Sequence, residues 1–194
     1  MIYTFMQKKF PKVFLFTDEF DLNTLSSLNK NIDIIYRNYQ KKIDKKTLIN
    51  LKNFCKRSGR KFYISNNIKL AIQFKTDGIY IPSFNKNTNF SNINTYQKFH
   101  IIGSAHNKKE IAIKKKQNCE LIFLAPLFNN PKYKKYLDII KFNLATLDEQ
   151  KIFIALGGIN HKNINRVYLT NCIGIAGIRW IKKNGPRKIL RPFL

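Results

Sequence analysis

The sequence predicts an α/β fold, a compact (β/α)8 TIM barrel formed by a single domain of 194 residues. Short β-rich apolar runs alternate with longer stretches of helical periodicity, and eight such units follow one another. This alternation requires a mainly parallel sheet with helices outside it. Because no linker or internal repeat interrupts the units, we expect a closed barrel; an open sheet of flavodoxin-like order is the alternative.

The expected strands are short runs rich in Ile, Phe, Val and Leu. They are Val13–Thr17, Asp33–Arg37, Phe62–Ser65, Gly78–Ile81, His100–Ser104, Glu120–Leu124, Lys151–Leu156 and Ile173–Ala176. Helices are expected at Leu22–Asn29, Lys46–Arg57, Asn67–Phe74, Lys108–Gln117, within Tyr136–Leu147 and at Lys162–Tyr168, with a short helix or turn at Ile178–Lys182. Gly59 ends the second helix as a C-cap.

The net charge of +25 invites a nucleic-acid interpretation, but its distribution does not support one. The positive charge is mostly lysine spread along the whole chain, without an arginine stripe. Lysine shares A/T-rich codons with Asn, Ile, Phe and Tyr, which are also abundant, so codon bias would produce the same excess without any selection for binding. We therefore expect no nucleic-acid partner, although a positive field would attract phosphorylated substrates.

No apolar run is long enough to span a membrane, and polar residues interrupt the opening segment, which does not resemble a secretory signal. Cys55, Cys119 and Cys172 are far apart and lack CxxC spacing, which favours three buried thiols over a zinc site or a disulfide. We expect a cytoplasmic protein without a membrane partner; the sequence leaves the oligomeric state open.

Two glycine turns are the strongest candidates for a binding site. Gly157 and Gly158 follow the seventh expected strand, and Gly177 follows the eighth. In (β/α)8 barrels these two loops often hold a phosphate, since glycines let main-chain N–H groups approach an anion. The alternative for the glycine pair is a tight turn that merely needs positive φ.

Other polar residues stand at expected strand ends. His106, with Ser104 nearby, follows the fifth strand and suits a general acid or base; the alternative is a structural histidine bonded to a loop carbonyl. Arg37 ends the second strand, where its guanidinium could bind a phosphate or simply lie on the surface. The loop after the sixth strand contains Asn130 and the basic residues Lys132 and Lys134, and could close over an anion.

These segments, in order and spacing over almost the whole chain, resemble the thiamine-phosphate synthase and thiazole-tautomerase superfamily of phosphate-binding barrels. The matching stretches are Phe14–Asp18, Ile35–Arg37, Thr76–Ile81, Ile101–His106, Ala125–Phe128, Ala155–Asn160 and Gly174–Ile178. The synthases join hydroxymethylpyrimidine pyrophosphate to thiazole phosphate and release pyrophosphate with the help of Mg²⁺. The resemblance implies small phosphorylated thiazole and pyrimidine substrates, with the thiazole phosphate at Gly158 and the Gly177 turn, and the pyrophosphate at Arg37 and Ser104.

The chain departs from the synthase pattern where the metal is expected. Asn66 and Asn85 occupy the positions of two Mg²⁺-binding aspartates, and a neutral amide is a poorer ligand for a hard cation, so any Mg²⁺ site is weakened. Tyr39 stands where the synthases have lysine. The segment that begins at Asn130 replaces a Thr-x-Thr-Lys pattern, and Lys132 or Lys134 could substitute for the lost lysine.

Three hypotheses follow from the resemblance and its departures. The first, which we favour, is a divergent thiamine-phosphate synthase of weak or altered activity. The second is a metal-free relative, such as a thiazole-phosphate tautomerase, in which His106 moves protons. The third is a non-catalytic binder of a phosphorylated ligand, with a nucleic-acid binder, which the net charge of +25 would explain, as the less favoured form of this hypothesis.

Overall fold

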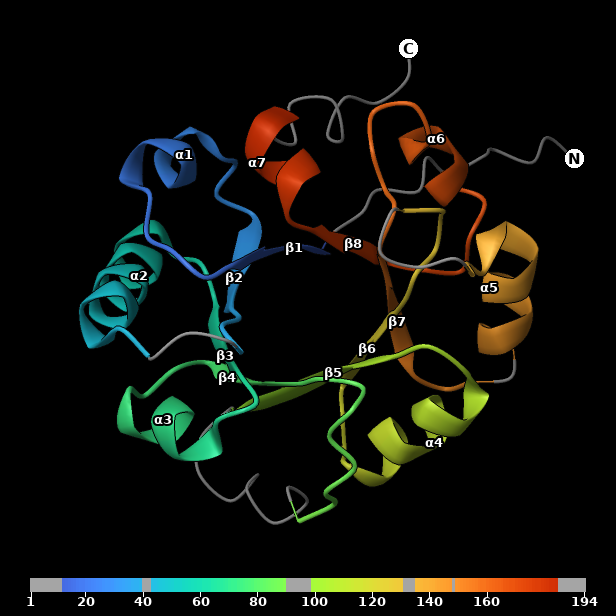
Figure 1. Cartoon of the computed structure of the whole chain (residues 1–194), viewed down its shortest axis with the longest axis horizontal. Helices are drawn as coiled ribbons and strands as arrows, with labels where there is room; N and C mark the ends of the chain where they lie inside the picture. The colour runs from blue at the N-terminus through green and yellow to red at the C-terminus, as the bar shows by residue number, and fades with distance from the viewer. Residues whose placement is uncertain (1–11, 40–42, 90–98, 131–134, 148, 185–194) are drawn as a thin grey trace, which may run out of the picture.

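The computed structural model describes residues 12–39, 43–89, 99–130, 135–147 and 149–184. Eight parallel strands close into one barrel in the order β1 to β8, and helices surround it (Figure 1). The predicted closed barrel is therefore confirmed, and the open sheet is excluded. No helix in these ranges is both long and apolar enough to cross a bilayer.

The predicted elements are all present, and their ends differ from the predicted ones by at most two residues. The strands are β1 (Lys12–Thr17), β2 (Ile32–Tyr36), β3 (Phe62–Ser65), β4 (Gly78–Ile81), β5 (His100–Ala105), β6 (Leu121–Leu124), β7 (Ile152–Leu156) and β8 (Gly174–Gly177). The helices are α1 (Leu22–Ser27), α2 (Lys45–Ser58), α3 (Ile68–Gln73), α4 (Lys108–Lys116), α5 (Asp138–Thr146), α6 (Ile164–Val167) and α7 (Arg179–Asn184). Between β4 and β5, the described residues 82–89 form no helix.

Local sequence explains where the longest helix begins and ends. The Asp44 carboxylate accepts hydrogen bonds from the amides of Lys46 and Thr47, which satisfies donors that α2 leaves unpaired at its first turn. Gly59 adopts a left-handed φ of 68° and donates its amide to carbonyls of the last turn, as the sequence predicts. Between these caps, Leu48, Leu51 and Cys55 face the core.

Alternation along the strands separates two buried clusters. One lies between the strands and the helices. The other fills the inside of the barrel and includes Phe14, Phe16, Tyr63, Tyr80 and Phe123. Near the carboxyl ends of the strands, the Phe16 ring lies 5.1 Å from Tyr80 and 6.0 Å from Phe123, centroid to centroid. These aromatic rings form the floor of the barrel mouth.

The three cysteines are buried free thiols, as expected. Burial raises the pKa of both Cys55 and Cys119 to about 12, so neither carries an appreciable thiolate at neutral pH. We predict that an aromatic disulfide reagent at about pH 8 labels no cysteine of the native protein within minutes and all three after unfolding in guanidinium. Rapid labelling of the folded protein would contradict this packing.

Candidate active site at the mouth of the barrel

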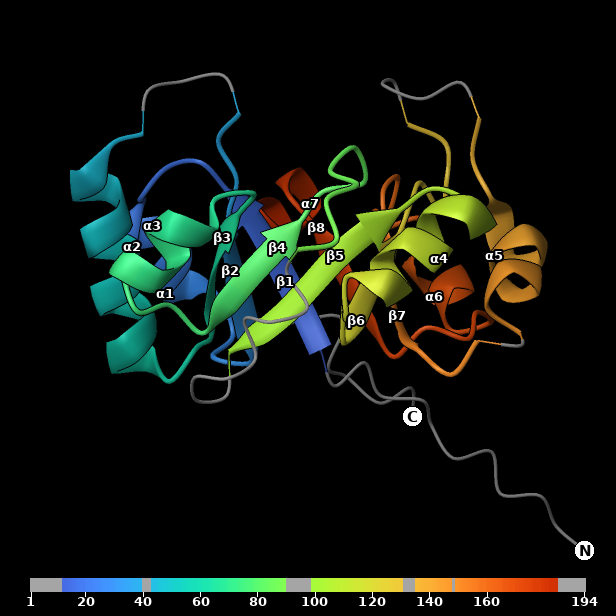
Figure 2. The same cartoon turned by 90° about the horizontal axis from the view of Figure 1, so that it is seen from below.

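The carboxyl ends of the strands meet at the upper face of the barrel in Figure 2. Arg37 lies at this face. Its amide donates to the Thr17 carbonyl at 2.8 Å, and its guanidinium carbon lies 4.6 Å from the centroid of the Phe16 ring. The side chain therefore packs on the aromatic floor and does not extend along the outer surface. Stacking leaves the N–H edges of a guanidinium available to a phosphate.

Asn66 and Asn85 are brought into direct contact. Asn85 Nδ2 donates to Asn66 Oδ1 at 2.7 Å, and Asn85 Oδ1 accepts the Asn87 amide at 2.9 Å. Asn66 has a φ of 57°, a left-handed conformation that asparagine tolerates, and its amide donates to the Tyr80 carbonyl. We call these two side chains the amide pair.

An aromatic contact beside the amide pair was not predicted. The hydroxyls of Tyr39 and Ser65 lie 2.7 Å apart, and the ring of Tyr39 meets that of Phe84 edge-on, with centroids 5.4 Å apart. The two rings come from loops after β2 and β4, which are not adjacent in the sheet. Tyr39 thus fills, with a neutral side chain, the position where the resemblance implies a lysine.

The predicted acid–base residues follow β5. Ser104 is 5 % exposed and shares the inward side of the strand with Ile102. The His106 ring contacts the Ala125 carbonyl through Nδ1 at 2.7 Å, and its amide donates to Glu110 Oε2. A carbonyl only accepts, so the neutral ring carries its proton on Nδ1 and Nε2 is the basic nitrogen. The bond to a loop carbonyl, which the structural alternative predicts, is present, and it fixes the orientation of the ring.

The glycine pair forms a turn that only glycine can occupy. Gly157 and Gly158 have φ values of 88° and 74°. A Cβ on Gly158 would lie 2.2 Å from the Phe128 carbonyl oxygen, and one on Gly157 would lie 3.8 Å from Asn130 Nδ2. The turn therefore needs the positive φ values that glycine allows, as the alternative predicts. It also brings the Asn130 side chain close to the main chain of Gly157.

The turn has main-chain donors to offer. Within the described ranges, neither the Gly158 amide nor the Ile159 amide donates a hydrogen bond. β7 and β8 are neighbours, with Leu156 opposite Ala176, so Gly177, which is the last residue of β8 rather than the first residue after it, lies beside this turn. Successive main-chain N–H groups of this kind can bind an anion. Lys132 and Lys134, which the sequence places in the adjoining loop, lie outside the described residues.

Comparison with known proteins decides the family. Residues 28–181, most of the chain, match the family described as Thiamine monophosphate synthase. The chain belongs to the thiamine monophosphate synthase family. The resemblance inferred from the sequence is confirmed.

Individual relatives of this family are distant. The thiamine-phosphate synthases of Prochlorococcus marinus and Helicobacter pylori are each 28 % identical, over 145 and 141 residues. These matches cover 73 % and 69 % of this chain but only 37 % and 63 % of the relatives. Thiamine phosphate pyrophosphorylase from Pyrococcus furiosus superposes with a TM-score of 0.74 at 16 % identity, covering 94 % of this chain and 96 % of that one. At that identity the superposition supports the barrel alone.

The residues present do not fit the Mg²⁺ that the family resemblance implies. Mg²⁺ binds through carboxylate oxygens and keeps several waters. Here Asn66 Oδ1 and Asn85 Oδ1, the atoms that would face the metal, each already accept a hydrogen bond. Among the residues described, no group of three His, Cys, Asp or Glu side chains is placed to hold a metal ion.

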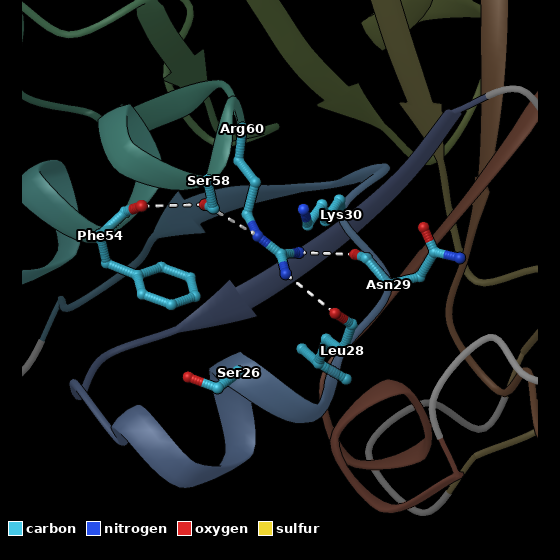
Figure 3. Close-up of a pocket in the computed structure, with 7 residues that line it drawn as sticks. All are labelled: Ser26, Leu28, Asn29, Lys30, Phe54, Ser58 and Arg60. Carbon is cyan, nitrogen blue, oxygen red and sulfur yellow. Dashed lines mark hydrogen bonds between the residues drawn. The ribbon is translucent and has the colours of Figure 1, made fainter.

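A pocket at the opposite end of the barrel belongs to no predicted site. It is lined by the loop that precedes β2, including Leu28 and Asn29, and by Ser58 and Arg60, which precede β3 (Figure 3). The Arg60 guanidinium donates to carbonyls and to the Ser58 hydroxyl, so its donors serve the fold. We therefore place the candidate site at the mouth.

Proposed function

We propose that this chain acts in thiamine biosynthesis as a thiamine-phosphate synthase-like transferase, joining hydroxymethylpyrimidine pyrophosphate to a thiazole phosphate. The observation that carries the proposal is the Gly157–Gly158 turn, which lies beside Gly177 at the mouth of a family barrel. We further propose that this reaction takes place in the cytoplasm.

The mouth divides into two halves that suit the two substrates. The Gly158 turn and Gly177 bind the thiazole phosphate, with Asn130 beside them. Arg37 and Ser104 face the pyrophosphate, where Arg37 offsets charge that develops as the C–O bond breaks and the new C–N bond forms. Lys132, which lies outside the described residues, is proposed as a further cation that binds substrate phosphate.

The test supplies purified protein with both substrates and measures thiamine phosphate and released pyrophosphate. We expect one pyrophosphate per thiamine phosphate, and no turnover in Gly158→Asp, because a carboxylate at this turn repels the phosphate. Turnover by the wild-type protein no greater than that of Gly158→Asp would reject the transferase.

A thiazole-phosphate tautomerase is the second candidate, because the amide pair replaces carboxylates while His106 keeps an oriented, basic Nε2. If this reaction occurs, His106→Asn should slow it by about 100-fold or more, the usual contribution of a general acid or base. Proton exchange into the thiazole phosphate, followed by NMR, measures the rate. An unchanged rate in His106→Asn would count against this candidate.

A further inference from the structure

Lys114 is buried in a place where lysine is rare. It lies on α4 with a fully buried side chain, whereas its neighbour Lys115 pairs with Glu149 at the surface. Lys114 Nζ donates to the carbonyls of Pro82 at 2.8 Å and Asn85 at 3.0 Å, and to Gln117 Oε1 at 2.8 Å. All three acceptors are neutral oxygens.

The backbone makes room for this side chain. Lys114 reaches across β5, where a Cβ on Gly103 would lie 2.9 Å from Lys114 Cδ and 2.9 Å from the Ile81 carbonyl oxygen. A larger residue at position 103 would therefore push the lysine stem aside. The absence of a side chain at Gly103 thus allows the Lys114 ammonium group to reach the loop after β4.

Gln117 completes the attachment of that loop. Its Nε2 donates to the carbonyls of Asn85 at 2.9 Å and Asn87 at 2.7 Å. The segment 82–87 is thus fastened to α4 at three carbonyls, those of Pro82, Asn85 and Asn87. The same segment presents the Asn85 side chain to Asn66 and Phe84 to Tyr39.

The ammonium charge of Lys114 affects which ions can bind on the side of the mouth that holds the amide pair. Burial lowers the pKa of Lys114 to about 8, so the ammonium form still predominates at neutral pH. A positive charge 3.0 Å from the Asn85 carbonyl opposes a second cation at the amide pair and attracts an anion. Because the ammonium is buried away from water, both its repulsion of a cation and its attraction of an anion are stronger than at the surface.

We propose that Lys114 is a positioning residue that holds Asn85 against Asn66 and supplies fixed positive charge, so that this half of the mouth binds a pyrophosphate-class anion without a divalent cation. The identity of the anion rests on the proposed function. Two other parts of the proposal, the position of the positive charge and binding without a metal ion, rest on the contacts of Lys114, Gln117 and the amide pair.

The experiment titrates inorganic pyrophosphate into the full chain by calorimetry, in EDTA and in excess Mg²⁺. We expect saturable binding in EDTA. Lys114→Met should weaken it by about tenfold or more, the effect of losing a charged hydrogen-bonding group. The matched control Lys115→Met removes the same charge from the surface of the same helix and should change affinity by about twofold or less. Folding of each variant is verified by circular dichroism.

The pH dependence of pyrophosphate affinity distinguishes an effect of the Lys114 charge from a purely structural role of this side chain. The ratio of wild-type to Lys114→Met affinity should fall as pH rises through about 8, because the wild-type ammonium loses its proton there. Cys119 and Glu110 are the other titratable groups that act on this ammonium. Both proteins are titrated with the same mixture of pyrophosphate protonation states, so the ratio removes the part of this pH dependence that they share.

The proposal is overturned if wild-type protein binds pyrophosphate only with Mg²⁺ or not at all, or if folded Lys114→Met binds it like the wild type. If Lys114→Met does not fold, Mn²⁺ titration of the wild type, followed by electron paramagnetic resonance, decides. No saturable binding supports the proposal; saturable binding that Asn66→Ala abolishes overturns it. Thiamine phosphate formation tests the proposed function separately.

Discussion

Replacing Arg60 with methionine is expected to lower the free energy of unfolding by about 3–5 kcal/mol, the largest loss of stability we predict for a single side chain. The side chain is 5 % exposed, and its guanidinium donates to the carbonyls of Leu25, Leu28, Asn29 and Ile32. Its Nε donates to the Ser58 hydroxyl, so one residue joins the end of α1, β2 and the end of α2 (Figure 3). Methionine keeps the volume but leaves these acceptors without their donor.

Urea denaturation followed by circular dichroism measures the effect, and two variants control it. Arg57→Met removes the same charge from an exposed position on α2 and should change stability by about 0.5 kcal/mol or less. Arg60→Lys keeps the charge but has fewer donors and no planar fork, so an intermediate loss is expected. A loss below about 1 kcal/mol for Arg60→Met would show that the carbonyls find other partners.

The second large effect concerns Gly158→Ala. The added Cβ would stand 2.2 Å from the Phe128 carbonyl oxygen, and the φ of 74° is unfavourable for alanine. The turn must therefore move or the loop after β6 must shift, and we expect a loss of stability of about 2–4 kcal/mol. Because the turn carries the proposed phosphate site, binding of thiazole phosphate should weaken by at least about tenfold.

Two other glycines separate the causes of that loss. Gly59 has a similar φ of 68°, but no atom lies within 4 Å of an added Cβ. Gly59→Ala therefore measures only the loss of stability caused by the left-handed backbone conformation, about 1 kcal/mol. Gly177→Ala meets only the flexible Ile181 side chain, at 3.4 Å, and should be tolerated. If Gly158→Ala costs no more than Gly59→Ala, the close approach to Phe128 is not a constraint on the turn.

Much of the fold follows from local sequence. The strands are short β-rich runs with turn residues between them, and capping residues such as Asp44 and Gly59 mark helix ends. The glycine turns could be placed at the mouth because strand counting put them after the last two strands. The contact between Asn66 and Asn85 was predictable only through the family pattern, since no local signal joins residues 19 positions apart.

The remaining features depend on tertiary contacts. Lys114 stands in a run of three lysines on α4, a pattern typical of a solvated face; it is buried because Gly103 leaves space across β5. Arg60 follows a helix cap like many surface arginines, and its role depends on carbonyls about 30 residues earlier. The pairing of Tyr39 with Phe84 requires two loops to meet over the mouth.

The most direct test of the account is calorimetric titration of thiazole phosphate into wild-type protein and Gly177→Asp, in EDTA and in Mg²⁺. The site beside the glycine turns predicts saturable binding by the wild type, equal in both buffers. Binding should be lost in Gly177→Asp, which adds a carboxylate where a side chain has room. No binding by the wild type, or equal binding by folded Gly177→Asp, would contradict a phosphate site at the mouth of this barrel.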